Sequence, residues 1–225
     1  MGTRVSFSKQ EIKQDKFADF MNEGRDWAAD NMSTILGIVA VVVLLGVGLY
    51  FFSDYRAGQA EAARAELAQA KTKMLSGNLQ VGLLELRAVA DKYSGSETGA
   101  EALYMLGSAN YLNKNYDQAM QAFEEYVKKY NSMKVTHDAA LAGIAACKEN
   151  TGAYAEAAQQ YLKALDYYPE APIAEDNALG ALRNYLYAGD TANARKMLDR
   201  IDSDFWQSPV VITAKRLFEE IKPVG

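Results

Sequence analysis

The sequence predicts an all-α protein in three parts: an amphipathic helix at residues 1–32, a single membrane-spanning helix at 33–53, and a solenoid of stacked helical hairpins at 54–225. Three observations lead to this prediction. One apolar run stands out in length and purity, and a pattern of small and large residues recurs every 37 or 38 positions. No stretch of useful length alternates with the period of two that half-buried strands require.

The N-terminal segment favours an amphipathic helix. Ser8 and Glu11 have the spacing of an N-terminal capping box. Beyond them Phe17, Phe20 and Trp27 fall on one stripe at helical spacing, opposite an acidic face. Because acidic residues outnumber basic ones here, the attraction to anionic lipid is weak. We interpret the stripe as a surface that packs on another protein at the membrane. The alternative is a helix that lies on the bilayer surface without a dedicated partner.

The apolar run Ile35–Phe52 predicts a membrane-spanning helix. As a helix, its 18 uncharged residues would extend roughly 27 Å, which is close to the thickness of a bilayer's hydrocarbon core. Lipid forces a helix because the backbone must satisfy its own hydrogen bonds. Tyr50 and Trp27 suit the membrane interfaces. Lysine and arginine residues are balanced close to the run, and Arg4 and Lys9 tip the prediction towards a cytoplasmic N-terminus.

The rest of the chain repeats a helical hairpin. Four small residues recur at separations of 37, 38 and 37, namely Gly82, Ala119, Ala157 and Ala194. A large residue follows each after four positions, namely Leu86, Phe123, Tyr161 and Leu198, and a turn residue precedes each by five, namely Gly77, Lys114, Gly152 and Gly189. The small residue lets the second helix approach the first, and the large one fills the next gap on the same face. Because one hairpin cannot bury its apolar face alone, the hairpins stack, and residues 210–222 predict a final capping helix.

Residues 102–130 resemble the tetratricopeptide repeat family. Leu103, Leu106 and Gly107 match the first helix of its pattern, and Ala119 and Phe123 match the second. The resemblance implies about four hairpins over residues 60–205, whose first helices line a concave groove. The groove positions that it implies are Glu101, Tyr104, Met105, Ser108, Tyr111, Leu112, Ala142, Gly143, Ala146, Glu149, Asn150, Asp176, Leu179, Gly180, Arg183 and Tyr187. We take Tyr104, Met105, Tyr111, Leu179, Arg183 and Tyr187 as candidate partner-binding residues, with Phe17, Phe20 and Trp27 of the N-terminal helix. The alternative for the tyrosines is packing between hairpins.

The composition argues against catalysis and nucleic-acid binding. The formal net charge is −5 and the isoelectric point is about 5.1, so there is no basic field to hold a phosphate backbone. The only cysteine, Cys147, cannot form an internal disulfide, and the only histidine, His137, cannot build a histidine-based metal site. Cys147 lies among small apolar residues, which is typical of a buried core thiol. We expect no enzymatic activity, no cofactor or metal, and no nucleic-acid partner.

The layout of the whole chain is similar to that of a family of bacterial inner-membrane proteins that includes the ancillary subunit of the Sec translocon. This resemblance implies a short cytoplasmic arm, one membrane helix and a periplasmic tetratricopeptide-like domain. It also implies contacts with other proteins and with the lipid bilayer. We therefore expect an adaptor or scaffold for periplasmic chaperones or translocating clients. The alternative is a permanent structural subunit of a larger membrane complex.

Overall fold

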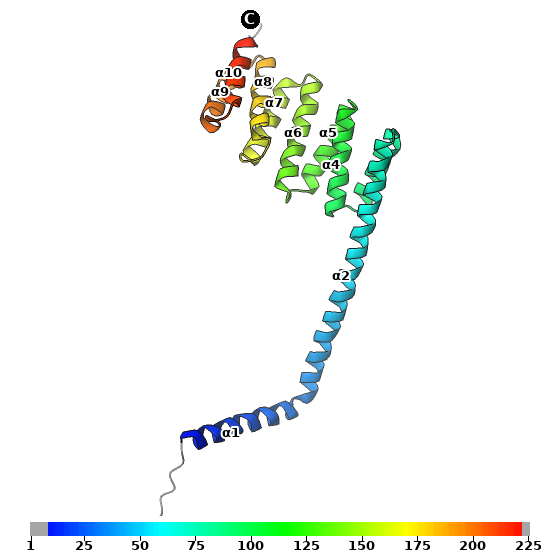
Figure 1. The fold of residues 1–225 in the computed structure, drawn as a ribbon, viewed down its shortest axis with the longest axis vertical. Coiled ribbons are helices and arrows are strands. Elements are labelled where there is room, and N and C mark those ends of the chain that lie inside the picture. The colour runs from blue at the N-terminus through cyan, green and yellow to red at the C-terminus, as the bar shows by residue number, and fades with distance from the viewer. Residues whose placement is uncertain (1–8, 222–225) are drawn as a thin grey trace, which may run out of the picture. The chain divides into compact units, whose positions relative to one another are not determined.

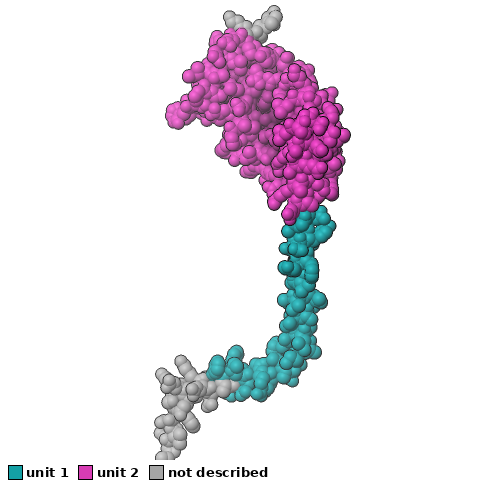
Figure 2. Space-filling model, turned by 45° about the vertical axis from the view of Figure 1, so that its right-hand side comes forward, with its two compact units in different colours: residues 1–59 teal, residues 60–225 magenta. Residues whose placement is uncertain are grey.

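The fold is entirely helical over the part of the chain that the structure, a computed structural model, describes, which is residues 9–221. These residues form ten helices and no strand, as predicted. The helices are α1 (Lys9–Asp30), α2 (Met32–Leu75), α3 (Leu79–Lys92), α4 (Glu97–Leu112), α5 (Tyr116–Lys129), α6 (Lys134–Asn150), α7 (Tyr154–Tyr167), α8 (Ala174–Tyr187), α9 (Thr191–Asp204) and α10 (Val210–Glu220) (Figure 1). The chain divides into two compact units, residues 1–59 and 60–225, which Figure 2 shows in different colours.

The first unit contains α1 and the apolar part of α2. The helix α2 is long and apolar enough to cross a membrane, and none of its most apolar stretch is buried against protein. It runs without a break to Leu75, so the Ala-rich segment 55–75 continues the apolar helix. The predicted cap residue Ser8 lies outside the described residues, and α1 begins at Lys9.

The second unit is a row of helical hairpins. The end of α2 packs on α3, where Gly82 approaches Ala70 and Lys92 pairs with Glu66. The pairs α4 with α5, α6 with α7 and α8 with α9 follow in order. The small residues at the repeated position are buried, and Ala119, Ala157 and Ala194 are fully inaccessible to solvent. A Cβ atom added to Gly82 would lie 3.2 Å from the backbone oxygen of Ala70 in α2. The small residue therefore does let the second helix press closely on the first, as the repeat pattern predicts.

The same turn closes all four hairpins. Gly77, Gly152 and Gly189 have φ angles of +87°, +82° and +74°, and Lys114 has φ +61°. In the turn after α4, the amide of Lys114 donates to the carbonyl of Tyr111, and the amide of Asn115 donates to the carbonyl of Asn110. The other three turns have the same pair of hydrogen bonds, which defines the Schellman motif. One residue of this motif has a left-handed backbone conformation, which glycine adopts without steric cost. Three of the four hairpins have glycine there, and the α4–α5 hairpin has Lys114.

Adjacent hairpins interlock through aromatic rings that pack on glycines. The ring of Phe123 in α5 lies between Gly107 of α4 and Gly143 of α6, and a Cβ atom on either glycine would lie 2.7 Å from a ring carbon. Tyr161 of α7 packs in the same way on Gly180 of α8, where the closest such approach is 2.9 Å. These contacts hold each first helix against the second helix of the preceding hairpin.

The helix α10 closes the C-terminal end of the row. It packs on α8 and α9, and its buried residues are Val210, Val211 and Ala214. Pro209 precedes its first turn, where the missing amide hydrogen is not needed. The predicted capping helix is thus confirmed, because α10 covers the apolar face that α8 and α9 would otherwise expose.

Candidate functional site

A groove of about 440 Å³ lies between the first helices α6 and α8. We name it the first-helix groove. Its lining residues are Ala142, Gly143 and Ala146 of α6, Tyr161 of α7, and Ile173, Asp176, Asn177, Leu179 and Arg183 in and just before α8. The α6 wall is made of the small residues Ala142, Gly143 and Ala146, and the Phe123 ring packs on Gly143. The α8 wall is apolar at Ile173 and Leu179 and charged at Asp176 and Arg183.

A bidentate ion pair crosses one end of the first-helix groove. Arg183 Nε donates to Glu149 Oε1 at 2.6 Å, and a second guanidinium nitrogen donates to Glu149 Oε2 at 2.8 Å. Tyr161 also donates its hydroxyl to Glu149 Oε2, at 3.1 Å. The pair links α6 to α8 and joins both helices to α7. Because the charges of Arg183 and Glu149 cancel each other, the guanidinium does not present an isolated positive charge to a ligand.

The environment of this ion pair shifts the pKa values of its members in directions that strengthen it. Burial by itself raises the pKa of the Glu149 carboxyl, but the hydrogen bonds and charge of Arg183 outweigh it and hold that pKa below its usual value. The hydrogen bond to Glu149 in turn raises the pKa of Arg183. Burial, with the Glu149 charge beside it, raises the pKa of Tyr161. All three groups therefore keep one protonation state near neutral pH.

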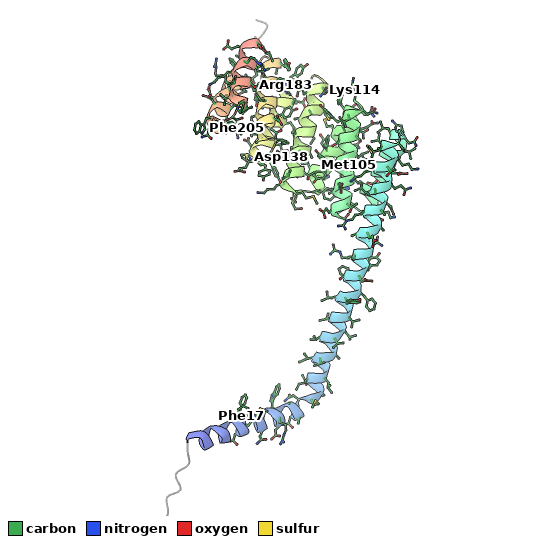
Figure 3. The ribbon with its side chains drawn as sticks, viewed as in Figure 1. Phe17, Met105, Lys114, Asp138, Arg183 and Phe205 are labelled. Carbon is green, nitrogen blue, oxygen red and sulfur yellow. The ribbon has the colours of Figure 1, made fainter. Side chains whose placement is uncertain are left out.

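The sequence-predicted groove residues fall into two sets. Leu179 and Arg183 line the first-helix groove (Figure 3 labels Arg183), together with the implied positions Ala142, Gly143, Ala146 and Asp176. Tyr104 and Met105 of α4 instead pack, partly buried, on the core of the first hairpins. The ring of Tyr104 has its centroid 5.7 Å from that of Phe123 and 5.9 Å from that of Tyr126. The structure therefore does not bring all six candidate residues to one cavity.

The remaining two candidates lie at the turn end of the first helices. Asn150 donates to the hydroxyl of Tyr111 at 3.0 Å and accepts from the hydroxyl of Tyr116 at 3.2 Å, so one carboxamide bridges two tyrosines of the preceding hairpin. Burial raises the pKa of Tyr111. Tyr187 is 49% exposed and packs on Tyr154, with ring centroids 5.2 Å apart. Both tyrosines thus have aromatic partners and keep some exposed surface.

The candidates in α1 are exposed. Phe17, Phe20 and Trp27 have 66%, 71% and 65% of their surface accessible, and Met21 on the same helix is 56% exposed. Single exposed hydrophobic residues are common on protein surfaces, but four large ones together on one helix indicate an interaction surface. This stripe is therefore available to lipid or to another protein.

Sequence reasoning missed part of the first-helix groove. Ile173 and Asn177 line it, although no sequence pattern indicates them, and the repeat pattern predicts a core position for Tyr161, which also lines it. The pairing of Glu149 with Arg183 was also missed, although a signal existed. The two residues are 34 positions apart, and the Arg87–Glu125 and Arg200–Asp166 pairs span 38 and 34. Opposite charges about one repeat apart therefore mark ion pairs between neighbouring hairpins.

The buried polar residues of α6 lie away from solvent. Cys147 is 1% exposed, and burial raises the pKa of its thiol to about 11, so it is not a thiolate near neutral pH. Asp138 is fully buried and accepts a hydrogen bond from Asn177 of α8 at 3.3 Å. Its second carboxylate oxygen has no hydrogen-bond partner within the described residues. Neither residue is placed to act on a ligand in solution.

Comparison with known proteins agrees with this architecture. Residues 25–170 match the sequence pattern of the tetratricopeptide repeat-like domain family. The chain belongs to this family. The matched residues of this tetratricopeptide repeat-like protein include the whole apolar run of α2 as well as the hairpins up to the end of α7. The fold of the family is typical of non-enzymatic interaction modules, and no catalytic family is indicated.

Two similar solved structures come from a putative kinesin light chain of Podosopora anserina with nearly identical TPR-like repeats, one of them a variant of the other. They are 15% and 16% identical to this chain, each with a TM-score of 0.55 over 70% of this chain and 84% of theirs. At this level of identity the likeness shows the fold alone. No curated protein sequence matches the chain.

Proposed function

We propose that this tetratricopeptide repeat-like protein is a membrane-anchored scaffold that binds extended segments of other proteins in the first-helix groove. In this proposal, residues 33–53 anchor the chain in a bacterial inner membrane. Residues 1–32 form a cytoplasmic arm, and residues 54–225 lie in the periplasm. There the protein acts as an adaptor for periplasmic chaperones or translocating clients.

The observation that carries the binding role is the composition of the first-helix groove. Small residues on α6 leave room for a main chain to approach closely, and Ile173 and Leu179 offer apolar surface. The only basic side chain in the lining, Arg183, is already paired with Glu149. A ligand selected by this groove is therefore an apolar stretch of polypeptide rather than a terminal carboxylate, since the exposed Asp176 would also repel an anion.

The anchor rests on the apolar part of α2. Leu36, Leu44 and Phe51 are each at least 60% exposed, and they belong to a continuous apolar surface. Exposing such a surface to water is unfavourable, so soluble proteins rarely have one. A bilayer covers such a surface, and a helix satisfies its own backbone hydrogen bonds within lipid. The match of the family pattern to this run supports the anchor as part of the same protein module.

The topology can be tested with single cysteines, because the chain has one native cysteine and it is buried. Cys147 is first replaced by serine, and a new cysteine is placed at exposed Glu23 in α1 or at exposed Gln159 in α7. A membrane-impermeant maleimide is then added to intact spheroplasts. The proposal predicts that Gln159→Cys is labelled and that Glu23→Cys is labelled only after lysis. The reverse pattern would contradict the proposed orientation.

The exposed α1 stripe favours a second candidate function, that of a permanent subunit of a membrane complex. Phe17, Phe20 and Trp27 would then be covered by a fixed partner. Purification in mild detergent followed by a high-salt wash separates the two functions. A partner that stays in fixed ratio, and that Phe20→Asp releases, supports the subunit. Partners that are recovered only after crosslinking through the solenoid support the adaptor.

A further inference from the structure

A second groove lies on the other side of the hairpins, between the second helices α3 and α5. We name it the second-helix groove. Its volume is about 600 Å³, larger than the 440 Å³ of the first-helix groove. Leu83 of α3, Leu106 of α4 and Ala122 of α5 contribute apolar surface to its lining. No sequence pattern predicted it, and it is not part of the proposed binding function above.

The second-helix groove can be compared with the equivalent positions between later second helices, namely between α5 and α7 and between α7 and α9. Between α5 and α7, Lys148 and Glu156 stand where the second-helix groove has Asn110 and Gln118, and these two charged residues form an ion pair. Between α7 and α9 the equivalent groove is only about 210 Å³, and Tyr185 and Met197 stand in place of Asn110 and Ala122. The groove between α3 and α5 is therefore open. The equivalent position between α5 and α7 is bridged by an ion pair, and the one between α7 and α9 has a smaller volume.

The surface of α3 is also unusually apolar at this groove. Leu84 is 72% exposed, and the equivalent residues of the later second helices are Gln121, Gln159 and Lys196. Val81, one helical turn earlier and outside the groove lining, is 45% exposed. Its equivalents are Gln118, Glu156 and Asn193. Three helices thus place polar residues on this face while α3 exposes two aliphatic ones, which indicates a covered surface.

The polar lining of the second-helix groove is made of carboxamides. Gln80, Gln118 and Gln121 are exposed, and within residues 17–221 none of their side chains forms a hydrogen bond to another residue of the chain. The one charged lining residue, Arg87, is held by Asp91 at 3.1 Å and by Glu125 at 2.6 Å. A carboxamide carries both a donor and an acceptor, as a peptide group does. The groove is therefore neutral and complementary to polypeptide main chain.

We propose that the second-helix groove binds an extended, uncharged polypeptide segment of a partner protein. The main-chain amides of the segment pair with Gln80, Gln118 and Gln121, and an apolar side chain of the segment packs on Leu84. Charged segments are disfavoured, because the lining offers no free charge to replace their lost hydration. This site is separate from the first-helix groove, so one scaffold holds two polypeptides on opposite sides of its hairpins.

The probe for this proposal is a panel of fluorescein-labelled nonapeptides, acetylated and amidated, built of Ser and Thr with Ala, Val, Leu or Phe at the centre. Each is titrated by fluorescence anisotropy against the full chain in lipid nanodiscs, in the Ala146→Trp background that fills the first-helix groove, so that only the second-helix groove can bind the peptide. We expect saturable binding that is at least five-fold tighter with central Leu than with central Ala. Methylating alternate main-chain nitrogens of the Leu peptide should weaken binding at least ten-fold. Equal binding of the methylated peptide, or no saturable binding at all, overturns the proposal.

Two variants test whether the peptide binds in the second-helix groove. Leu84→Gln restores the residue type of the later repeats and should weaken binding at least five-fold, whereas Leu75→Gln, at a 90% exposed leucine outside the groove, should leave it unchanged. The double variant Asn110→Lys, Gln118→Glu transplants the ion pair of the next repeat and should abolish binding. If Leu84→Gln has no effect on affinity, the proposal fails. It also fails if sedimentation shows that Leu84→Gln converts a dimer to a monomer, because the occupant is then a second copy of this chain.

Discussion

The ring of Phe123 occupies the space that a side chain at Gly143 would need. A Cβ atom at Gly143 would lie 2.7 Å from one edge of the ring, and one at Gly107 would lie 2.7 Å from the opposite edge. The ring is 4% exposed and cannot move away from one glycine without moving towards the other. This contact sets how closely α4 and α6 approach α5, and it thereby sets the shape of the α6 wall in the first-helix groove.

Replacing Gly143 by Ala should destabilise the solenoid. In an ordinary helix this change stabilises by about 1 kcal/mol, but overpacking a closed contact costs about 1–3 kcal/mol, so we expect a net loss of stability. The control is Gly58→Ala in α2, where an added Cβ meets no atom within 4 Å. Thermal denaturation followed by circular dichroism measures both. A Gly143→Ala variant that is as stable as the Gly58→Ala variant would contradict the close contact.

Replacing Lys114, which is labelled in Figure 3, by Gly should stabilise the α4–α5 hairpin. Lys114 has φ +61° at the position where the other three hairpins have glycine. A left-handed conformation costs a residue with a Cβ about 1–2 kcal/mol, and glycine avoids this cost. Gly152→Ala introduces the same strain in the next hairpin and should destabilise by about 1 kcal/mol. Urea denaturation of the two variants should therefore move in opposite directions, and equal shifts would refute the turn assignment.

The Glu149–Arg183 pair should show coupling in a double-mutant cycle. Glu149→Ala leaves the Arg183 guanidinium partly buried without its partner, and Arg183→Ala does the same to the carboxylate. Because Arg183 keeps about a third of its side chain in water, solvent screens the pair, and we expect a coupling free energy of about 1 kcal/mol. The measurement is the free energy of unfolding of both single variants and the double variant. Strict additivity would mean that the two side chains do not interact.

Asp138 should make the protein less stable as the pH rises. Burial raises the pKa of its carboxyl from 3.8 to about 6 in the folded chain, so the folded state holds this proton more tightly than the unfolded state does. The stabilisation is full below pH 4 and is lost as the pH rises through 6, by about 3 kcal/mol at most. Asp138→Asn removes this dependence.

The lowered pKa values of Glu125 and Glu149 act in the opposite sense, so the informative quantity is the difference in unfolding free energy between Asp138→Asn and the wild type. This difference should increase in favour of the variant between pH 4 and pH 7. A difference that stays constant over that range would show that Asp138 does not titrate as described.

The hairpins were predictable because short-range patterns determine them. The burial of Ala119 follows from its spacing to Phe123, and the positive φ at Gly77, Gly152 and Gly189 follows from their place in the turns. Each of these patterns spans only a few residues. They repeat at a constant period, so one recognised hairpin predicts its neighbours.

The binding surfaces were less predictable because they depend on residues one repeat apart. Whether Tyr104 faces a groove or the core is decided by Phe123 and Tyr126 of the following helix, against which its ring packs. The second-helix groove exists because Asn110 and Gln118 stand where the next repeat has an ion pair. Such differences between equivalent positions become meaningful only when the structure shows which positions face each other.

The most direct test of the scaffold is photocrosslinking from the first-helix groove in living cells. A benzoylphenylalanine is placed at Leu179 on the groove wall or, as a control, at the exposed residue Lys163 of α7. If the groove binds polypeptide, ultraviolet light should yield a defined protein adduct from Leu179 and none from Lys163. The Leu179 adduct should also disappear when Ala146→Trp fills the groove. No adduct from Leu179, or the same adducts from both positions, would contradict the claim that this groove binds other proteins.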